Sequence, residues 1–187
     1  MTKTELRKIY KEKRKAISSK DKLKYDDLIL LQLQKLYFEN VQVLLTYWPM
    51  ELEPNMQIVT SYIKHTNYAL RVAYPVTNFS NNTMCAIGVE DDTSFTTNTF
   101  GLTEPKNGEE INANEIDIVF VPLFIFDLRG YRVGYGKGFY DKFLASCKND
   151  VIKIGFCYFE PIEKIDDTNN FDIPLNYCIT PHNIYEF

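Results

Sequence analysis

The most constraining feature of the sequence is an apolar run near its centre, Ile118 to Phe126, which only Pro122 interrupts. The run is far too short to cross a bilayer, which takes about 20 apolar residues. The overlapping stretch Ile116 to Val121 predicts a strand that is apolar on both sides. Strands of this kind occur in parallel sheets that are covered on both faces. The chain therefore needs a layered, folded body around this strand.

Short β-branched and aromatic runs alternate with helical patterns on either side of it. The alternation predicts an α/β sheet with parallel pairs, in a single domain that spans residues 1–187. Ligands of such sheets bind at the carboxyl ends of the strands. Residues 90–115 are polar and rich in turn residues, and we expect them to wrap the surface. Helices are predicted at residues 3–17, 21–39, 54–64 and 138–147, and strands at 41–48, 68–74, 84–89, 116–121, 151–158 and 177–179.

The composition, 45% apolar and 25% charged residues in a chain of 187, is that of a soluble globular protein. It excludes disorder, collagen-like and coiled-coil structure. The four cysteines show no C-x-x-C spacing, so neither a zinc site nor a disulfide framework is expected. The N-terminus is basic and has no apolar segment behind it, unlike a secretory signal. We expect a cytoplasmic protein with reduced thiols.

The charge is unevenly distributed along the chain. Residues 1–24 hold ten Lys or Arg and three Asp or Glu, so they carry +7 and the remainder carries −11. In the first predicted helix, Lys3, Arg7 and Arg14 lie on the flank of an apolar stripe. These cations either face inward at the edge of the domain or are solvated. If they face inward, this basic N-terminal arm can bind a polyanion. The stripe consists of Leu6, Ile9, Tyr10 and Ile17, and the buried candidates of the second helix are Leu23, Leu30, Leu33 and Tyr37.

Half of the eight glycines lie in the segment 130–138, which follows the most apolar strand and opens a predicted helix. Alternating glycines allow the backbone to form a concave nest of N–H groups, which suits an anion. Lys137 and Arg132 add cations, and Asp141 in the first helical turn is a candidate ligand for a divalent metal that bridges phosphates. The spacing G-x-G-x-G matches neither the Walker loop nor the dinucleotide fingerprint. Tight turns also need glycine, and an acid at a helix start is favoured by the helix dipole.

The segment Arg132-Val133-Gly134-Tyr135-Gly136-Lys137-Gly138-Phe139-Tyr140-Asp141-Lys142-Phe143-Leu144 resembles the signature of the 5-formyltetrahydrofolate cyclo-ligases. Val121-Pro122 and Phe126-Asp127 extend the match towards the N-terminus. The resemblance covers essentially the whole chain. Further matches, in chain order, are Lys3-x-x-Leu6-Arg7, Glu51-Leu52-Glu53-Pro54, Gly101-Leu102-x-Glu104-Pro105 and Asp172-Ile173-Pro174.

The resemblance implies a three-layer α/β/α sandwich with a mostly parallel central sheet. It also implies the ATP-dependent conversion of 5-formyltetrahydrofolate to 5,10-methenyltetrahydrofolate with release of ADP and phosphate, and Mg²⁺ as the metal. Lys3 and Arg7 would reach ATP, and Glu51 would contact the folate. Asp141 and Asp172 would hold Mg²⁺. The implied phosphate cradle is Gly134, Tyr135, Gly136, Lys137, Gly138, Phe139 and Tyr140, with Arg132 and Lys137 as the catalytic cations.

Two departures from the family pattern bear on the site. Leu123 and Ile125 stand where many members have smaller residues, which predicts a bulkier wall beside the loop. Tyr135 stands where some members have Arg, which leaves a larger share of the anion binding to Arg132 and Lys137. Trp48 and Tyr140 are candidates by position for the aromatic wall of the pterin pocket, although most aromatic residues must be core.

We expect the partners to be ATP and 5-formyltetrahydrofolate, with one or several glutamates, and a monomeric protein that binds neither nucleic acid nor a membrane. The acidic body has no basic stripe with interleaved aromatics, which is a poor footprint for nucleic acid. Three alternatives stay open. One is an enzyme that acts on a phosphorylated sugar or on another nucleotide-activated amide. The second is a module whose basic arm binds nucleic acid, and the third is a family member that binds folate without turnover.

Overall fold

The computed structural model describes residues 1–38 and 40–187, and its core is one eight-stranded sheet. The strand order is β12-β11-β10-β7-β1-β2-β3-β6. The strands of this sheet are β1 (Val43–Leu45), β2 (Arg71–Asn78), β3 (Thr83–Val89), β6 (Glu110–Ile111), β7 (Ile118–Val121), β10 (Ile152–Phe156), β11 (Tyr177–Ile179) and β12 (Ile184–Glu186).

The central part of the sheet is parallel. β11, β10, β7, β1 and β2 all run in one direction, whereas β12, β3 and β6 pair antiparallel at the two sides. The register sets Leu45 beside Val119 and Phe120 beside Ile154. All four residues of β7 are buried, as the apolar run predicts for a strand covered on both faces.

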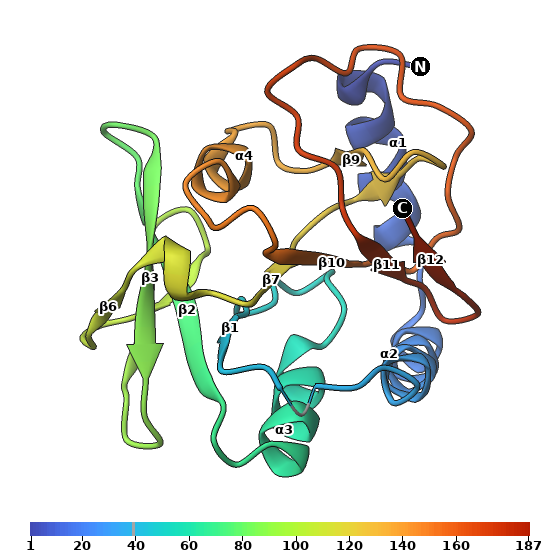
Figure 1. The fold of residues 1–187 in the computed structure, drawn as a ribbon. Coiled ribbons are helices and arrows are strands. Elements are labelled where there is room, and N and C mark those ends of the chain that lie inside the picture. The colour runs from blue at the N-terminus through green and yellow to red at the C-terminus, as the bar shows by residue number, and fades with distance from the viewer. Residues whose placement is uncertain (39) are drawn as a thin grey trace.

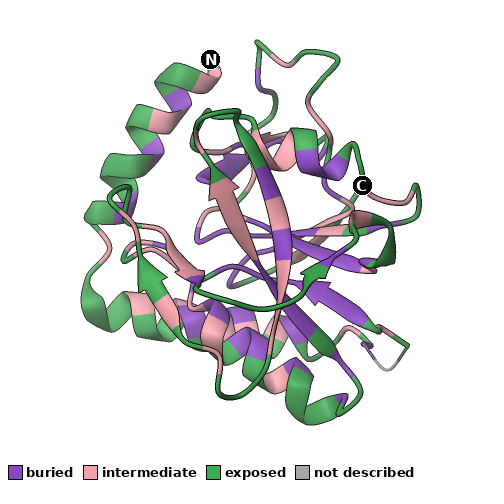
Figure 2. Cartoon of the chain, turned by 90° about the vertical axis from the view of Figure 1, so that its left-hand side faces the viewer, coloured by how far each residue is buried: buried purple, intermediate pink, exposed green. Residues whose placement is uncertain are grey.

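Among the described residues, four α-helices cover the two faces of the sheet, and Figure 1 shows their arrangement. α1 (Lys3–Lys15) and α4 (Phe139–Leu144) lie on one side, and α2 (Ser19–Leu33) and α3 (Met56–Thr66) lie on the other. Successive residues of β7 point to opposite faces, so Val119 packs in the core under α1 and Phe120 in the core under α2 and α3. Figure 2 shows buried residues gathered along the strands of the sheet, with the exposed sides of the helices facing outward. The prediction of a three-layer α/β/α sandwich with a mostly parallel sheet is confirmed.

The sequence predicted that the second strand ends before Pro75, and this prediction was wrong. β2 continues to Asn78 and pairs with β3 over its whole second half, with Pro75 opposite Ala86. β1 pairs with β2 only as far as Ala73. Beyond that residue β2 is an edge strand on one side, where a proline that lacks an N–H donor is tolerated.

The burial predicted for the second helix was partly wrong. Leu23 is 65% exposed and Tyr37, beyond the end of α2, is 90% exposed. The prediction is confirmed for Leu33, and the other buried residues of α2 are Asp26 and Ile29. Asp26 is buried because it accepts hydrogen bonds from the hydroxyl of Tyr158 and the amide of Asn55. The end of the predicted helix at residue 39 lies outside the described residues.

Several short elements were not predicted. The polar stretch 90–115 contains β4 (Phe95–Thr97), β5 (Thr103–Pro105), β6 and the 3₁₀ turn η1 (Ala113–Glu115). The glycine-rich segment begins as a small hairpin of β8 (Ile125–Phe126) and β9 (Arg132–Val133). Two- and three-residue strands are too short to produce an alternating pattern in the sequence. None of the described helices is long and apolar enough to cross a membrane.

Candidate functional site

The glycine loop, residues 134–138, joins β9 to α4 beyond the carboxyl end of β7. Gly136 has φ +88° and Gly138 has φ +72°, a backbone region that side chains disfavour. Gly138 is the N-cap of α4 and makes no side-chain cap hydrogen bond. Gly136 and Gly138 are therefore required by the path of the backbone into the helix.

Helix α1 holds this loop from one side. It starts at a capping box, in which Thr2 and Glu5 bond each other's backbone. One turn later, Nε of Arg7 donates to the carbonyl of Gly134 at 2.8 Å. The guanidinium of Arg7 lies over Gly136, where a Cβ atom would stand 3.0 Å from Nη2. Of the two alternatives left open by the sequence, the inward-facing one is correct for the cations of this helix face.

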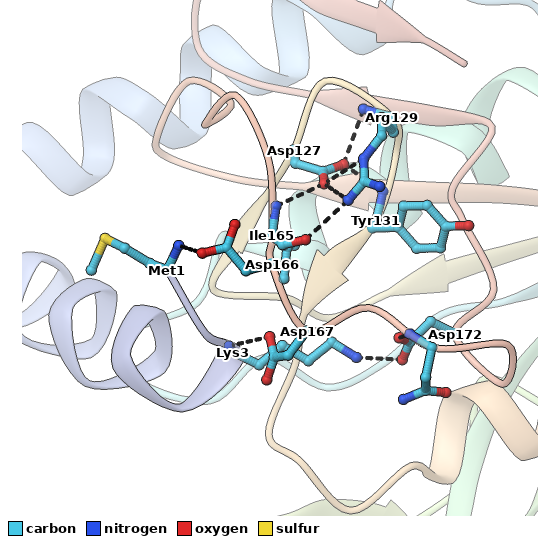
Figure 3. Close-up of polar contacts among 10 residues, drawn as sticks. Met1, Lys3, Asp127, Arg129, Tyr131, Ile165, Asp166, Asp167 and Asp172 are labelled. Carbon is cyan, nitrogen blue, oxygen red and sulfur yellow. Dashed lines mark hydrogen bonds and ion pairs between the residues drawn. The ribbon is translucent and has the colours of Figure 1, made fainter.

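Lys3, at the start of α1, reaches the C-terminal part of the chain. Its ammonium lies 2.5 Å from Oδ1 of Asp172, and each side chain is 18% exposed. Its backbone N–H donates to Asp167 at 2.6 Å. Figure 3 shows Lys3 extending from the helix towards Asp172. The basic arm is thus anchored beside a carboxylate that the family resemblance implies to be a metal ligand.

The second predicted metal ligand, Asp141, lies next to the same segment. Its Oδ1 accepts from Nη2 of Arg132 at 2.8 Å and from the N–H of Ile173 at 3.1 Å. Arg132 also donates to the carbonyl of Ile173, and its side chain is only 6% exposed. Asp141 bonds to the backbone of Ile173, and Ile173 directly follows Asp172. One short stretch of backbone therefore links the two predicted metal ligands.

Asp127 explains how the distant segment is brought here. Its fully buried carboxylate accepts from the backbone N–H groups of Arg129, Tyr131 and Ile165, and from the guanidinium of Arg129 at 2.7 Å. The bond to Ile165 fixes the start of the loop 165–172, which carries Asp167 and Asp172 (Figure 3). The Phe126-Asp127 pair in the sequence signature therefore has a structural role.

A second polar cluster lies beside the glycine loop and consists of Arg14, Glu53 and Tyr135. The hydroxyl of Tyr135 donates to Oε1 of Glu53 at 2.5 Å, and the N–H of Met50 donates to Oε2 at 2.8 Å. Glu53 is 3% exposed. Burial raises the pKa of this carboxyl, although both hydrogen bonds and the charge of Arg14 act in the opposite direction.

Arg14 is buried as well, at 2% exposed. It donates to the carbonyl of Leu123 and stacks 4.8 Å from the ring centroid of Phe124. Its Nε and Nη1 atoms have no hydrogen-bond partner among the described residues. Nearby, burial and the Glu53 carboxylate raise the pKa of both Tyr47 and Tyr140. The hydrogen bond from Tyr135 thus connects the turn that carries Glu53 with the loop.

The remaining predicted residues are distributed around this centre. Lys137 is exposed at the tip of the loop, and no hydrogen bond or ion pair holds it within the described part of the chain. Glu51 is exposed, two residues from the buried Glu53. Phe139 packs edge-on against Phe79, at 5.2 Å between ring centroids. Trp48 packs against Phe95 and Tyr74.

Leu123 and Ile125, the two bulky departures, are buried in the core under α1. They fill the space between the sheet and the helix, and Leu123 lies close against Gly155 of β10. Two surface hollows, of about 270 and 370 Å³, lie away from the loop. The first is beside Arg71 and Glu90, and the second is beside Asp117 and Lys148.

Sequence reasoning missed the roles of Arg14, Glu53 and Asp167. The sequence did contain a signal for Arg14, because this residue follows Arg7 by seven positions and so lies on the same helix face. Glu53 belongs to the segment Glu51–Pro54 that matches the family pattern, but its burial depends on Tyr135, which is 82 residues away. The stacking of Phe79 on Phe100, at 3.8 Å between centroids, had no sequence signal.

The fold and the site define the class of protein: an α/β enzyme with a glycine loop, inward-facing cations and paired carboxylates at the carboxyl edge of a parallel sheet. Comparison of the structure with solved structures of known proteins supports this class. The structure resembles the 5,10-methenyltetrahydrofolate synthetase of Aquifex aeolicus with a TM-score of 0.83 and 28% identity, over 100% of this chain and 93% of the other. It resembles the 5,10-methenyltetrahydrofolate synthetase of Mycoplasma pneumoniae with a TM-score of 0.78 and 25% identity, over 96% and 98%.

The sequence comparisons agree with the structural ones. A 5-formyltetrahydrofolate cyclo-ligase of Haemophilus influenzae is 33% identical over 129 residues, which are 67% of each chain. The profile of the 5-formyltetrahydrofolate cyclo-ligase family matches residues 1–181. The chain belongs to the 5-formyltetrahydrofolate cyclo-ligase family. Enzymes of this family convert 5-formyltetrahydrofolate to 5,10-methenyltetrahydrofolate with ATP.

Proposed function

We propose that this chain catalyses the family reaction by transferring the γ-phosphoryl group of ATP to the formyl oxygen of 5-formyltetrahydrofolate. A formamide is a poor electrophile and its oxygen is a poor leaving group. Phosphorylation of that oxygen gives an activated imidate, which N10 attacks to close the ring. Loss of phosphate then gives the methenyl product, and ADP is the other product. No protein nucleophile is required.

In this proposal, the residues of the chain supply position and charge, as in other phosphoryl transfers. The N–H groups of the loop 134–138 and the side chain of Lys137 bind the phosphates. Arg7 holds the loop through the carbonyl of Gly134 and keeps a cation over Gly136. Arg132 fixes Asp141 beside Ile173, which orients the carboxylate at the start of α4. Lys137 has no other partner in the described chain, so its ammonium is available for ATP.

We assign Asp141 and Asp172 to Mg²⁺. Mg²⁺ is usually held in such sites by one or two carboxylates together with phosphate oxygens and water, so two carboxylates fit. The described residues include no group of three or more metal-ligating side chains. When bound, Mg²⁺ would neutralise charge on the phosphates. Oδ2 of Asp141 has no hydrogen-bond partner among the described residues and is the first candidate ligand atom.

For the folate, we propose that Glu51 contacts the substrate and that Trp48 and Tyr140 contribute to the pterin wall. Glu51 is exposed on the turn that Glu53 anchors, so its carboxylate can reach a ligand beside the loop. The chain is expected to act as a cytoplasmic monomer, on the sequence grounds given above.

The single observation that carries the proposal is the convergence of Lys3, Arg7 and Arg132 with Asp141 and Asp172 around the loop. The test is an assay of purified protein with 5-formyltetrahydrofolate, ATP and Mg²⁺, in which the near-ultraviolet absorbance of the methenyl product and the ADP formed are both measured. We expect one ADP per methenyl product, and none without Mg²⁺. ADP formation that does not depend on 5-formyltetrahydrofolate would instead favour another nucleotide-activated substrate.

Lys137→Ala provides the matched test of the loop. It should lower kcat by about 10²–10³-fold, as expected when a donor to a developing anion is lost. It should change the free energy of unfolding by less than about 0.5 kcal/mol, because the side chain is exposed. Lys142→Ala, at an exposed lysine on the following helix, is the control. An unchanged rate in Lys137→Ala would remove this lysine from the mechanism.

A further inference from the structure

Contacts hold the glycine loop on two sides. Helix α1 provides the contacts on one side, and the buried Glu53 provides the contact on the other. Arg7 of that helix binds the carbonyl of Gly134 and lies over Gly136. The residue between these glycines is Tyr135, and its hydroxyl points the other way, to Oε1 of the buried Glu53 at 2.5 Å. A loop with glycines on both sides of one residue has little conformational preference of its own. Its position is therefore set by these side-chain contacts.

Glu53 belongs to a rigid turn. Its amide donates to the carbonyl of Met50 at 2.9 Å, and its Oε2 accepts from the amide of Met50 at 2.8 Å. Its own carbonyl lies 3.0 Å from the hydroxyl of Tyr158, which shares its one proton between this carbonyl and Asp26. The turn Met50–Glu53 is thus fixed to the end of β10, and it carries Glu51 on its exposed side.

The aromatic and cationic groups around the hydrogen bond between Tyr135 and Glu53 favour one arrangement of that bond. The ring of Tyr135 packs 4.8 Å from the ring of Phe124, and the guanidinium of Arg14 also lies 4.8 Å from that ring. Arg14 is 2% exposed and has two nitrogen atoms without a partner among the described residues. A buried cation beside a buried carboxylate offsets part of the cost of burying each one. Hydrogen bonds to an ionised acceptor are stronger than neutral ones.

We propose that Tyr135 is a positioning residue that locks the phosphate loop to the Met50–Glu53 turn through Glu53, so that the nucleotide and folate sides of the site are assembled together. This inference rests on the proposed function, because it assigns ATP to the loop and the folate to the turn. In this chain the side chain of Tyr135 is directed to Glu53.

The consequence is an energetic coupling between the two ligands. A ligand that orders the loop also orders the turn, so each ligand should bind more tightly when the other is present. The coupling should depend on the Tyr135 hydroxyl and on its acceptor. It should not depend on hydroxyls of the same segment that have no such partner.

The test uses Tyr135→Phe, which removes the hydroxyl and keeps the ring against Phe124. The affinity for a non-hydrolysable ATP analogue is measured with and without 5-formyltetrahydrofolate, and the steady-state constants are measured with ATP. In the wild type, we expect the folate to tighten analogue binding about fivefold or more. In Tyr135→Phe, this factor should fall below twofold, kcat should fall about tenfold, and both KM values should rise. Tyr131→Phe is the matched control, because its hydroxyl makes no hydrogen bond within the described residues.

Glu53→Gln extends the test as a double-mutant cycle. Its neutral amide is a weaker acceptor, so Tyr135→Phe should change kcat/KM less in the Glu53→Gln background than in the wild type. Wild-type coupling and rates in Tyr135→Phe, an equal loss in Tyr131→Phe, or additive effects in the cycle would each overturn the positioning role. A wild-type protein without ADP release dependent on 5-formyltetrahydrofolate would overturn the proposed function instead.

Discussion

The ammonium of Lys3 lies 2.5 Å from the carboxylate of Asp172, although 169 residues separate them in the sequence. The family resemblance implies that Lys3 reaches ATP, and the proposed function assigns Asp172 to Mg²⁺. Binding of a magnesium nucleotide would then exchange one ion pair for two ionic contacts with the ligand. The helix start is kept in place during this exchange by the backbone bond from Lys3 to Asp167.

Lys3→Ala is therefore expected to weaken ATP binding more than folate binding. Loss of one charge-assisted contact should raise the KM for ATP about tenfold, which corresponds to about 1.4 kcal/mol. The KM for 5-formyltetrahydrofolate should change less than about twofold on the same scale. Steady-state kinetics with each substrate varied in turn measures both. Lys8→Ala, at an exposed lysine of the same helix, controls for the loss of positive charge, and equal effects on both substrates would mean that Lys3 only anchors the helix.

Gly136→Ala tests the contact between the loop and Arg7. The substitution places a Cβ atom 3.0 Å from Nη2 and 3.1 Å from Cζ of Arg7, at φ +88°. Gly138→Ala has a similar backbone conformation, φ +72°, but meets no atom within 4 Å. Each should cost about 1–2 kcal/mol of strain, but only Gly136→Ala should displace Arg7. We expect a further loss of about tenfold in kcat/KM for ATP from Gly136→Ala, about 1.4 kcal/mol. Equal kinetic losses would show that backbone strain alone matters.

The layers and the order of strands along the chain were predictable, because their signals are local. The apolar stretch Ile116 to Val121 marks the central strand, and the helical stripe with Leu6 and Tyr10 marks α1. The resemblance located the loop and the charged residues around it. Asp141 was also recognisable from its place in the first turn of a helix.

The rest depended on long-range contacts that a sequence pattern does not report. Glu51 and Glu53 look alike in the sequence, yet only Glu53 is buried, because the Tyr135 hydroxyl and the Met50 amide satisfy its carboxylate. Pro75 looks like a strand end, yet it is tolerated where β2 has lost its neighbour β1. In each case the outcome is decided by a partner that the local pattern does not contain.

Asp127→Asn should destabilise the fold and the site together. The carboxylate is fully buried and accepts from three backbone N–H groups and from Arg129. Replacing it by a neutral amide should lower the free energy of unfolding by about 3 kcal/mol, because bonds to a buried charge are lost. Urea unfolding measures this change. Asp166→Asn, at an exposed acid in the adjoining loop, is the control, and a loss of the same size there would contradict a special role for Asp127.

The pH dependence of stability should reveal the burial of Glu53. Burial raises its pKa above the ordinary value of 4.5, so the folded state binds the proton more tightly than the unfolded state does. The contribution of Glu53 to the free energy of unfolding is then fully present below the unfolded pKa, falls as the pH rises through the folded pKa, and is constant above it. Glu53→Gln has no proton to lose, so the wild-type value minus the variant value should decrease as the pH rises above about 4.5 and then level off. Urea unfolding of both proteins over a pH series measures this difference, with Glu51→Gln as a control for net charge at an exposed position. A difference that grows with pH would mean that the hydrogen bonds from Tyr135 and Met50, together with Arg14, outweigh the burial of this carboxylate.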